Sequence, residues 1–330
     1  MIISWNTTNA CNLYCAHCYR DAGLKAADEL STAEGKKLLT EIAAAGFKIM
    51  IFSGGEPLTR PDIYELVLHA AQCGLRPVFG SNGTLLTAES AARLKEAGAV
   101  CIGISLDSLD EGKHDQLRGQ KGSHEAAVRG MRHCRAAGLA FQVHTTVMGW
   151  NDHEVEKITD FAIEEGAAAH HIFFLVPTGR AADIEQETLR AEQYEDLLTR
   201  ILRKQQQVKI ELKPTCAPQF TRIAEQLGIK TRFTRGCLAG VAYCIIGPRG
   251  DVQPCAYLDI KLGNVREQPF TDIWRQSPVL AELRTQEFEG GCGVCAYKKI
   301  CGGCRARAWY YHGSYMAEEP WCLYHDRKGY

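Results

Sequence analysis

Short apolar runs alternate with longer amphipathic stretches between about residue 30 and residue 176. The runs cover residues 49–52, 77–79, 100–105, 141–147 and 171–176. The stretches between them carry apolar residues at helical spacing, and capping residues mark their ends. In the first stretch, for example, Ser31 and Glu34 can form a capping box and Gly46 ends the helix. Counting residues 2–7, this pattern predicts six strands joined by helices, two of which cover residues 123–137 and 151–165.

This arrangement fixes the fold class as α/β. Strands that are joined through helices pair in parallel with right-handed crossovers. Short continuous apolar strands are typical of a sheet that helices cover. The pattern alone leaves open whether such a sheet closes into a barrel, stays open or stops partway.

The pattern changes after Pro177-Thr178-Gly179-Arg180. A charged helical stretch covers about residues 185–207, and a region rich in Cys, Gly and Pro follows it. We therefore predict a first domain over residues 1–180, a helical bridge over 181–230 and a cysteine-rich domain over 231–330. Apolar burial is too sparse to stabilise that last region alone, so bound metal must contribute.

Composition narrows the functional classes. The 330 residues are 45% hydrophobic and 23% charged, with a net charge of −1. These values are those of a globular protein and argue against disorder and coiled coil. The balanced charge argues against nucleic acid or a membrane surface as partner. Because no targeting segment or membrane-length apolar run is present, we expect a cytoplasmic protein.

The chain contains 15 cysteines, an odd number that favours metal ligation over a disulfide framework. Cys11, Cys15 and Cys18 directly follow the first predicted strand, at the edge where parallel sheets bind ligands. Three thiolates can hold three irons of a [4Fe–4S] cube and leave the fourth iron open to an external ligand. A zinc site completed by His17 is the alternative, although structural zinc usually takes four ligands from paired motifs.

Eight further cysteines lie near the end of the chain. They are Cys237, Cys244, Cys255, Cys292, Cys295, Cys301, Cys304 and Cys322. Eight soft ligands can hold two more cubes. Zinc ribbons built from the pairs 292/295 and 301/304 also have the usual spacing and remain an alternative.

The Cx3Cx2C spacing of Cys11, Cys15 and Cys18 resembles the signature of the radical S-adenosylmethionine (radical SAM) superfamily. Further features appear in the family's order: Ser53-Gly54-Gly55-Glu56-Pro57 after the second strand, Ser81-Asn82 after the third, and Ser105 and Asp107 at the end of the fourth. The resemblance implies a partial (β/α)6 TIM-like barrel that binds S-adenosylmethionine with these residues. Glycines 54 and 55 permit close backbone approach, and Glu56 offers an acceptor to the methionine ammonium group.

The C-terminal cysteines resemble those of the SPASM extension of radical SAM enzymes, which carries one or two auxiliary [4Fe–4S] clusters. That resemblance assigns Cys237, Cys244, Cys255 and Cys304 to one cluster, and Cys292, Cys295, Cys301 and Cys322 to the other. One departure concerns the last spacing, which is usually x3 in the family. Here it is x2, and Arg305 occupies the expected cysteine position.

Several segments resemble the radical SAM branch that acts in haem d1 synthesis and in the alternative haem pathway, among them Pro177–Ala181, Thr215–Gln219 and Cys301–Ala308. This resemblance implies a 5′-deoxyadenosyl radical that removes acetate or propionate carbons from a sirohaem-derived substrate, such as 12,18-didecarboxysirohaem. The implied partners are that iron tetrapyrrole and a low-potential electron donor such as ferredoxin or flavodoxin.

Individual side chains are candidates for roles beside the tetrapyrrole. Arg180, Arg235, Arg305 and Arg307 could pair with its carboxylates, although structural roles for arginines are commoner. Cys216 is a candidate catalytic hydrogen donor; an additional metal ligand and a buried small residue are the other readings. For His170 and His171 we expect a place in the core or at the rim.

Two other functions remain open at this point. A peptide-modifying radical SAM/SPASM maturase has the same two domains, but we expect it to carry a peptide-recognition segment, and none precedes Met1. A non-enzymatic iron–sulfur electron-transfer protein needs neither an open cluster iron nor a Gly-Gly-Glu-Pro segment.

Overall fold

The computed structural model describes residues 1–326 and contains one sheet of ten strands. Their order across the sheet is β10-β9-β8-β1-β2-β3-β4-β5-β6-β7. The bounds are β1 Ile2–Asn6, β2 Ile49–Ser53, β3 Arg76–Ser81, β4 Cys101–Ser105, β5 Phe141–Val147, β6 Ala169–Phe174, β7 Glu211–Thr215, β8 Tyr243–Ile246, β9 Asp251–Gln253 and β10 Gly263–Asn264. The six predicted strands are β1 to β6, and neighbouring members pair in parallel as expected.

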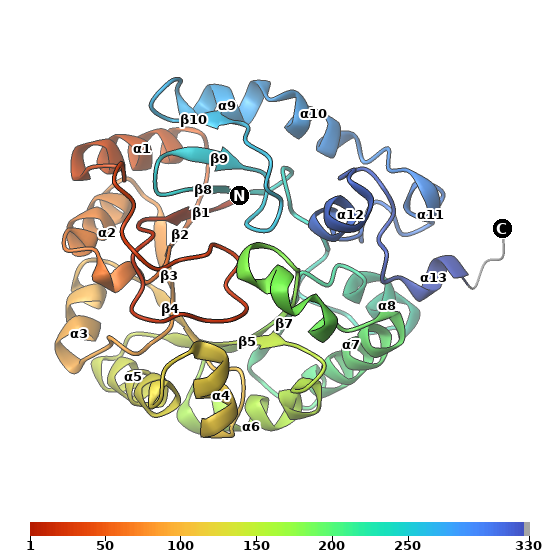
Figure 1. Ribbon diagram of the computed structural model, residues 1–330, viewed down its shortest axis with the longest axis horizontal. Coiled ribbons are helices and arrows are strands. Elements are labelled where there is room, and N and C mark those ends of the chain that lie inside the picture. Colours follow the sequence, from red (N-terminus) through yellow and green to blue (C-terminus); the bar gives the residue numbers. More distant parts are fainter. Residues whose placement is uncertain (327–330) are drawn as a thin grey trace.

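Helices cover the outer face of this curved sheet (Figure 1). Those of the first half are α1 Thr32–Ala44, α2 Ile63–Gln72, α3 Ala88–Glu96, α4 Glu111–Arg118, α5 Ser123–Ala137 and α6 Val155–Glu165. Those that follow are α7 Ala191–Gln205, α8 Phe220–Gln226, α9 Phe270–Gln276, α10 Pro278–Thr285, α11 Gly290–Gly293, α12 Arg305–His312 and α13 Leu323–Asp326, with short 3-10 turns η1 Pro57–Thr59, η2 Asp152–Glu154 and η3 Gly179–Glu187. The predicted capping box of Ser31 and Glu34 begins α1, and α5 has its predicted bounds.

The sheet forms a partial barrel. Its two edge strands, β7 and β10, do not pair with each other within residues 1–326, so the sheet stays open. β8 pairs in parallel with β1, and β7 pairs in parallel with β6. The sheet therefore runs across both expected domain boundaries, since β7 lies in the expected bridge and β8 lies in the expected cysteine-rich domain.

Strand alternation separates an outer, helix-packed face from an inner face. On β1, Ile3 and Trp5 are fully buried in the main core, and Trp5 packs on Phe52 with ring centroids 6.3 Å apart. The intervening Ser4 and Asn6 accept hydrogen bonds from Tyr243 and Tyr19 on the inner side. Polar side chains thus line the inside of the barrel while apolar ones stabilise it from outside. Within residues 1–326 no helix has the length and apolar character needed to cross a bilayer.

Candidate functional site

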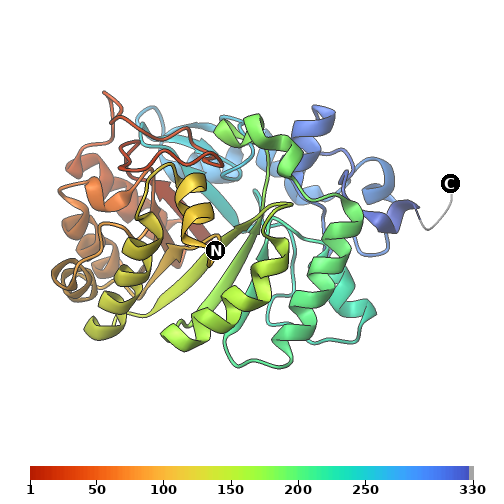
Figure 2. The same cartoon turned by 60° about the horizontal axis from the view of Figure 1, so that its bottom comes forward.

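The loop that carries Cys11, Cys15 and Cys18 lies across the edge formed by the carboxyl ends of the parallel strands. In Figure 2 this red loop runs along the top of the molecule beside the green turn η3. Backbone hydrogen bonds fix it at both ends: Cys11 N donates to Gly23 O (2.9 Å), and Arg180 N donates to Cys18 O (3.0 Å). The structure therefore places the N-terminal cysteine group at the ligand-binding edge that the sequence predicts.

The three thiols of the N-terminal group are close enough to influence one another. The pKa of Cys11 is raised to about 11, mainly by burial; the backbone hydrogen bond from Leu13 opposes the rise, and the negative charges of Glu56, Cys15 and Cys18 add to it. Burial also raises the pKa of Cys15. Because neighbouring thiolates repel one another, a set of thiolates this close together needs a positive centre among them. Iron supplies such a centre, so this donor set fits a cluster.

Arg118 at the end of α4 brings a positive charge to this group. Its Nη2 lies 2.6 Å from Asp107 Oδ2, and its Nη1 donates to Cys15 Sγ at 3.8 Å. Asp107 is fully buried, and the charge of Arg118 holds the pKa of its carboxyl below the usual value against the effect of burial. The predicted residue Asp107 thus acts on the cysteine group through Arg118, which sequence reasoning missed.

The Gly-Gly-Glu-Pro segment packs directly on the cysteine loop. A Cβ atom on Gly54 would lie 2.5 Å from Thr8 O, and one on Gly55 would lie 2.3 Å from Ala10 O. Gly55 N donates to Thr8 O (2.8 Å) and Glu56 N donates to Ala10 O (2.8 Å). The two glycines therefore allow the backbone after β2 to lie directly against the backbone after β1. From the sequence we had expected them to allow close approach of the backbone to a ligand.

The Glu56 carboxylate joins the ends of β2 and β3. It accepts hydrogen bonds from Ser81 Oγ at both oxygens (3.0 Å each), from Asn82 N (2.8 Å) and from Leu58 N (3.1 Å). Burial raises the pKa of Glu56 to about 7, and these hydrogen bonds oppose that rise. Glu56 is thus an acidic group, half ionised near neutral pH, at the edge of the sheet.

The remaining residues predicted to bind S-adenosylmethionine lie at the same edge. Asn82 Nδ2 donates to Asn12 Oδ1 (2.9 Å) and approaches Cys11 Sγ at 4.0 Å. Ser105 Oγ donates to Ser81 O (3.3 Å), while Ser53 O accepts from Thr7 N (2.8 Å). Pro57 begins η1. The structure thus brings all of the predicted cofactor residues together beside the N-terminal cysteine group.

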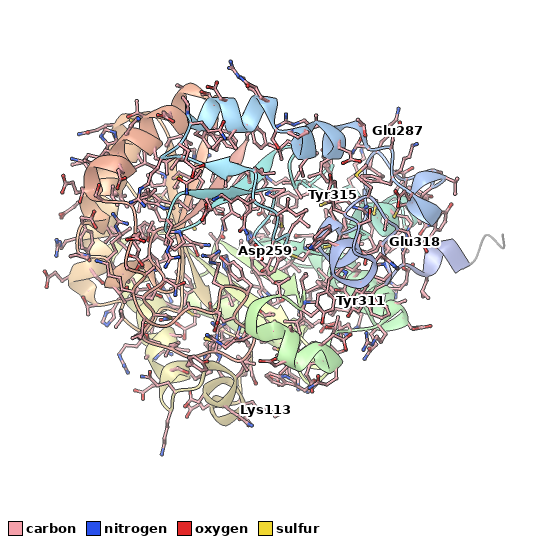
Figure 3. The ribbon with its side chains drawn as sticks, turned by 45° about the horizontal axis from the view of Figure 1, so that its top comes forward. Lys113, Asp259, Glu287, Tyr311, Tyr315 and Glu318 are labelled. Carbon is pink, nitrogen blue, oxygen red and sulfur yellow. The ribbon has the colours of Figure 1, made fainter. Side chains whose placement is uncertain are left out.

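Four C-terminal cysteines line one cavity, and we call them the outer group: Cys292, Cys295, Cys301 and Cys322. Arg222 and Glu319 also line this cavity. Glu318 accepts a hydrogen bond from Gly291 N (2.6 Å) and so anchors the turn before Cys292; Figure 3 labels Glu318 beside α11 and α12. This grouping matches the second ligand set that the family resemblance implies.

Cys304 belongs to a different group, together with Cys255 and Cys237, which we call the inner group. Cys304 and Cys255 belong to one buried cluster with Val176 and Leu258. Burial raises the pKa of Cys304, Arg307 opposes the rise, and the negative charges of Glu319 and Cys237 add to it. Burial raises the pKa of Cys255, and Cys237 and Cys304 raise it further. The inner group therefore lies beside the end of β6, close to the barrel interior.

Two glycines lie between Cys301 of the outer group and Cys304 of the inner group. Gly302 and Gly303 have φ values of +74° and +58°, which turn the chain so that Cys301 and Cys304 face different groups. Arg305, at the position where the family usually has cysteine, donates to Cys292 Sγ at 3.7 Å. The zinc ribbon that would combine the pairs 292/295 and 301/304 is not formed. Within residues 1–326 no three His, Cys, Asp or Glu side chains converge on a single-ion site.

Cys244 lies apart from the inner group, unlike in the ligand set that the family resemblance implies. It lies on β8, where its neighbour Tyr243 points to the inner face and donates to Ser4 Oγ (3.0 Å). By strand alternation Cys244 points outward, and it is fully buried in the main apolar core with Ile273 and Leu283 of α9 and α10. Cys216 instead packs with Cys304 and Cys255.

The candidate arginines are mostly engaged in internal contacts. Arg180 Nε donates to Cys15 O (2.9 Å), and Arg305 Nη1 donates to Tyr315 O (2.9 Å). Arg307 forms a fully buried ion pair with Glu319 (2.7 Å). Arg235 has a buried Nε that lacks a hydrogen-bond partner among the described residues. Three of the four candidates are therefore structural.

Histidines of β5 and β6 lie on both faces of the sheet: His170 lies under α6, while His144 and His171 face the barrel interior. His170 is fully buried between Thr159 and Thr145, at 2.9 Å from each hydroxyl oxygen, as expected of a core residue. His171 stacks on His144 with ring centroids 5.2 Å apart and ring planes within 7°. Burial lowers the pKa of both rings of this pair, so they are neutral at physiological pH. His144 could not be singled out from the sequence, because its position on β5 is that of any inward-facing polar residue.

An aromatic pair lies between the N-terminal cysteine group and the inner group. The rings of Tyr19, next to Cys18, and Tyr257, two residues after Cys255, have centroids 5.1 Å apart. Tyr19 donates to Asn6 Oδ1 (3.1 Å), which fixes the pair to the end of β1. The two sites are thus neighbours through packed side chains.

Comparison with known proteins agrees with this arrangement. Residues 5–162 match the radical SAM superfamily, and residues 237–305 match SPASM, described as an iron–sulfur cluster-binding domain. The chain is 43% identical to an AdoMet-dependent heme synthase of Nitratidesulfovibrio vulgaris, over 99% of this chain and 93% of that protein. It is 31% identical to an Fe-coproporphyrin III synthase of Methanosarcina barkeri (97% and 87%) and 30% identical to a pre-heme d1 synthase of Dinoroseobacter shibae (97% and 85%).

A solved structure has the same fold. Streptococcus suis SuiB bound to S-adenosylmethionine superposes with a TM-score of 0.80 at 17% identity, covering 97% of this chain and 76% of SuiB. The family matches, together with the cysteine groups, establish an enzyme that uses [4Fe–4S] clusters and S-adenosylmethionine. The chain belongs to the family of SPASM-containing radical SAM enzymes that includes the AdoMet-dependent heme synthases.

Proposed function

We propose that this radical SAM enzyme of haem biosynthesis removes acetate or propionate side-chain carbons from a sirohaem-derived iron tetrapyrrole. The observation that carries the proposal is the 43% identity to a heme synthase over nearly the whole of both chains, beside 31% and 30% to an Fe-coproporphyrin III synthase and a pre-heme d1 synthase. Because the sequence identity to the heme synthase is the highest of these three, we favour a reaction whose product is haem itself.

We propose that Cys11, Cys15 and Cys18 hold the cluster at which S-adenosylmethionine binds. When bound, this cluster and S-adenosylmethionine supply a 5′-deoxyadenosyl radical that removes a hydrogen atom from the substrate. Three ligands in this chain leave one iron for the cofactor. Arg118 stabilises the Cys15 thiolate, and Asp107 fixes the position of Arg118.

We propose that the edge formed by Ser53–Pro57, Ser81, Asn82, Ser105 and Asp107 receives S-adenosylmethionine. Glu56 lies at its centre and is already bound to the tip of β3, so it holds the edge rigid in addition to offering negative charge. A rigid edge keeps the cofactor and the substrate carbon at a fixed separation, which is the main requirement for selective hydrogen abstraction.

For the substrate we propose the interior of the barrel, where the paired rings of His144 and His171 lie below the carboxyl ends of the strands. For reduction we propose a low-potential donor such as ferredoxin or flavodoxin and a cytoplasmic site of action. The free state of all 15 cysteines is the observation that supports a reducing compartment.

The test is an anaerobic reaction of the reconstituted enzyme with S-adenosylmethionine, reductant and either 12,18-didecarboxysirohaem or iron coproporphyrin III. Tetrapyrrole mass and 5′-deoxyadenosine are followed together. We expect loss of side-chain carbons from one of the two, absent in Cys15→Ala. Formation of 5′-deoxyadenosine with neither tetrapyrrole altered would refute the substrate proposal and favour another substrate, a precursor peptide among them.

A further inference from the structure

The inner group contains three SPASM cysteines and lacks the fourth ligand that the family resemblance assigns. Cys244 lies in the apolar core behind β8, among side chains of α9 and α10. To reach the inner side it would have to exchange places with Tyr243, which requires a one-residue shift of β8 against β1. That shift would expose the buried Ile246 and break the parallel register from Ile2 with Tyr243 to Trp5 with Ile246.

Another cysteine, Cys216, lies next to the inner group. It follows β7 directly, and it packs with Cys304 and Cys255 around Val176 and Leu258. Cys216 therefore belongs to the same buried side-chain cluster as two of the three remaining members of the inner group, Cys304 and Cys255.

The backbone at Cys216 is in the left-handed region, with φ at +61°. A side chain is disfavoured there, and glycine is the residue that would relieve the strain. Such strained residues persist where the side chain has a function that the surrounding structure supports. The conformation thus marks position 216 as one where a side chain is kept in spite of backbone strain.

Buried hydrogen bonds hold Cys216 and Cys304 in a fixed relation. Arg307 Nη1 donates to Cys216 O (2.7 Å), and Arg307 Nε donates to Glu319 Oε1 (2.7 Å). Glu319 Oε2 in turn accepts from Cys304 N (2.5 Å). One ion pair therefore positions both cysteines, which is the preorganisation expected around a metal site.

We propose that Cys216 is the fourth cysteine ligand of an auxiliary iron–sulfur cluster held by Cys237, Cys255 and Cys304. The ligand set then draws on two segments, the end of barrel strand β7 and the C-terminal region, so loading this cluster joins the bridge to the cysteine-rich domain. The hydrogen-donor role that the sequence suggested for Cys216 is replaced by this ligand role.

The test uses full-length protein in which Cys11, Cys15 and Cys18 are all changed to alanine, so that only auxiliary clusters load. After anaerobic reconstitution with ⁵⁷Fe and sulfide, iron is counted and Mössbauer and EPR spectra are recorded. Two loaded cubes correspond to about eight iron atoms per chain. We add Cys216→Gly to this background, because glycine accepts the positive φ and protects the fold.

We expect Cys216→Gly to lose about half of the iron, or to keep it with an altered spectrum from a cluster that lacks one thiolate. The matched control Cys244→Ala should keep both the iron and the spectra. Unchanged iron and spectra in Cys216→Gly, or loss of a cluster in Cys244→Ala, would overturn the proposal. As a further check, Cys304→Ala is added to the same background. An unchanged iron content in that variant would also overturn the proposal, because the inner group would then hold no cluster.

Discussion

The guanidinium of Arg118 connects the Cys15 thiol with the buried Asp107 carboxylate. Its Nη1 is 3.8 Å from Cys15 Sγ, while its Nη2 is 2.6 Å from Asp107 Oδ2. A cation at this distance stabilises a thiolate, and its own buried counter-ion prevents it from moving away. This contact extends the N-terminal cysteine site beyond the Cx3Cx2C motif to α4, more than a hundred residues later in the sequence.

Arg118→Gln should weaken the N-terminal cluster site. Removing the cation leaves Asp107 buried without its partner and raises the cost of the Cys15 thiolate. We expect a decrease of about 10- to 100-fold in the rate of 5′-deoxyadenosine formation, as for other residues that orient metal ligands. Single-turnover assays measure this rate, and the iron content of each variant is determined alongside. Arg129→Gln, which removes an exposed pair with Glu125, should have no effect, and equal rates for both variants would contradict the assignment.

Glu56 should make the protein less stable as pH rises. Its folded pKa of about 7 lies above the usual value of 4.5, so the folded state retains a proton that the unfolded state releases between these pH values. Stability contributed by the protonated form is therefore present at pH 4.5 and lost progressively up to about pH 7, amounting to roughly 3 kcal/mol.

The Glu56→Gln variant lacks the titrating carboxyl group, so this pH-dependent part of the stability disappears. We expect the unfolding midpoint of the variant to vary less than that of the wild-type protein between pH 5 and pH 8, measured by thermal circular dichroism in the same buffers. The amide NH2 replaces one of the two oxygens that accept from the Asn82 and Leu58 N–H groups, so the variant loses one hydrogen bond at every pH. Parallel pH curves for the two proteins would show that Glu56 does not titrate in this range.

Gly303→Ala should disturb both C-terminal cysteine groups. A Cβ atom there would lie 2.4 Å from Arg305 Nη2 and 3.1 Å from Cys292 Sγ. Gly313→Ala is the matched control, because Gly313 has a similar φ of +69° and open space around it. Both variants incur backbone strain of about 1 kcal/mol, but only Gly303→Ala should lose auxiliary iron. Equal iron in the two variants would show that the turn tolerates a side chain.

Arg307→Met should destabilise the C-terminal region strongly. The change leaves Glu319 buried without its cation, at a cost of about 3–5 kcal/mol. Arg132→Met breaks an exposed pair with Glu165 of the same length, 2.7 Å, and should cost less than about 1 kcal/mol. Chemical denaturation of the loaded proteins compares the two. A small effect at Arg307 would mean that the pair adds little to this region.

The barrel half of the fold could be predicted because its signals are local. The capping box at Ser31 and the apolar run of residues 141–147 identify their elements without tertiary information. β7 gave no such signal, because it is short and contains Lys213 and Pro214; proline is tolerated there since β7 is an edge strand. α4 was missed because its sequence is almost wholly polar.

The cysteine motifs could be found from spacing, but their grouping depends on tertiary structure. Spacing cannot show that Cys244 points away from Cys255, because this depends on the register of β8 against β1. Likewise, Arg118 and Cys15 belong to elements far apart in the sequence. Contacts of this kind arise only when the sheet brings several strand ends to one edge.

Isotope transfer from the substrate side chain to 5′-deoxyadenosine tests the proposed reaction directly. The iron tetrapyrrole is supplied with deuterium on the carbons of its acetate and propionate side chains, and the 5′-deoxyadenosine formed by the loaded enzyme is analysed by mass spectrometry. We expect deuterium in 5′-deoxyadenosine together with loss of side-chain carbons from the tetrapyrrole. Unlabelled 5′-deoxyadenosine with an intact tetrapyrrole would contradict it.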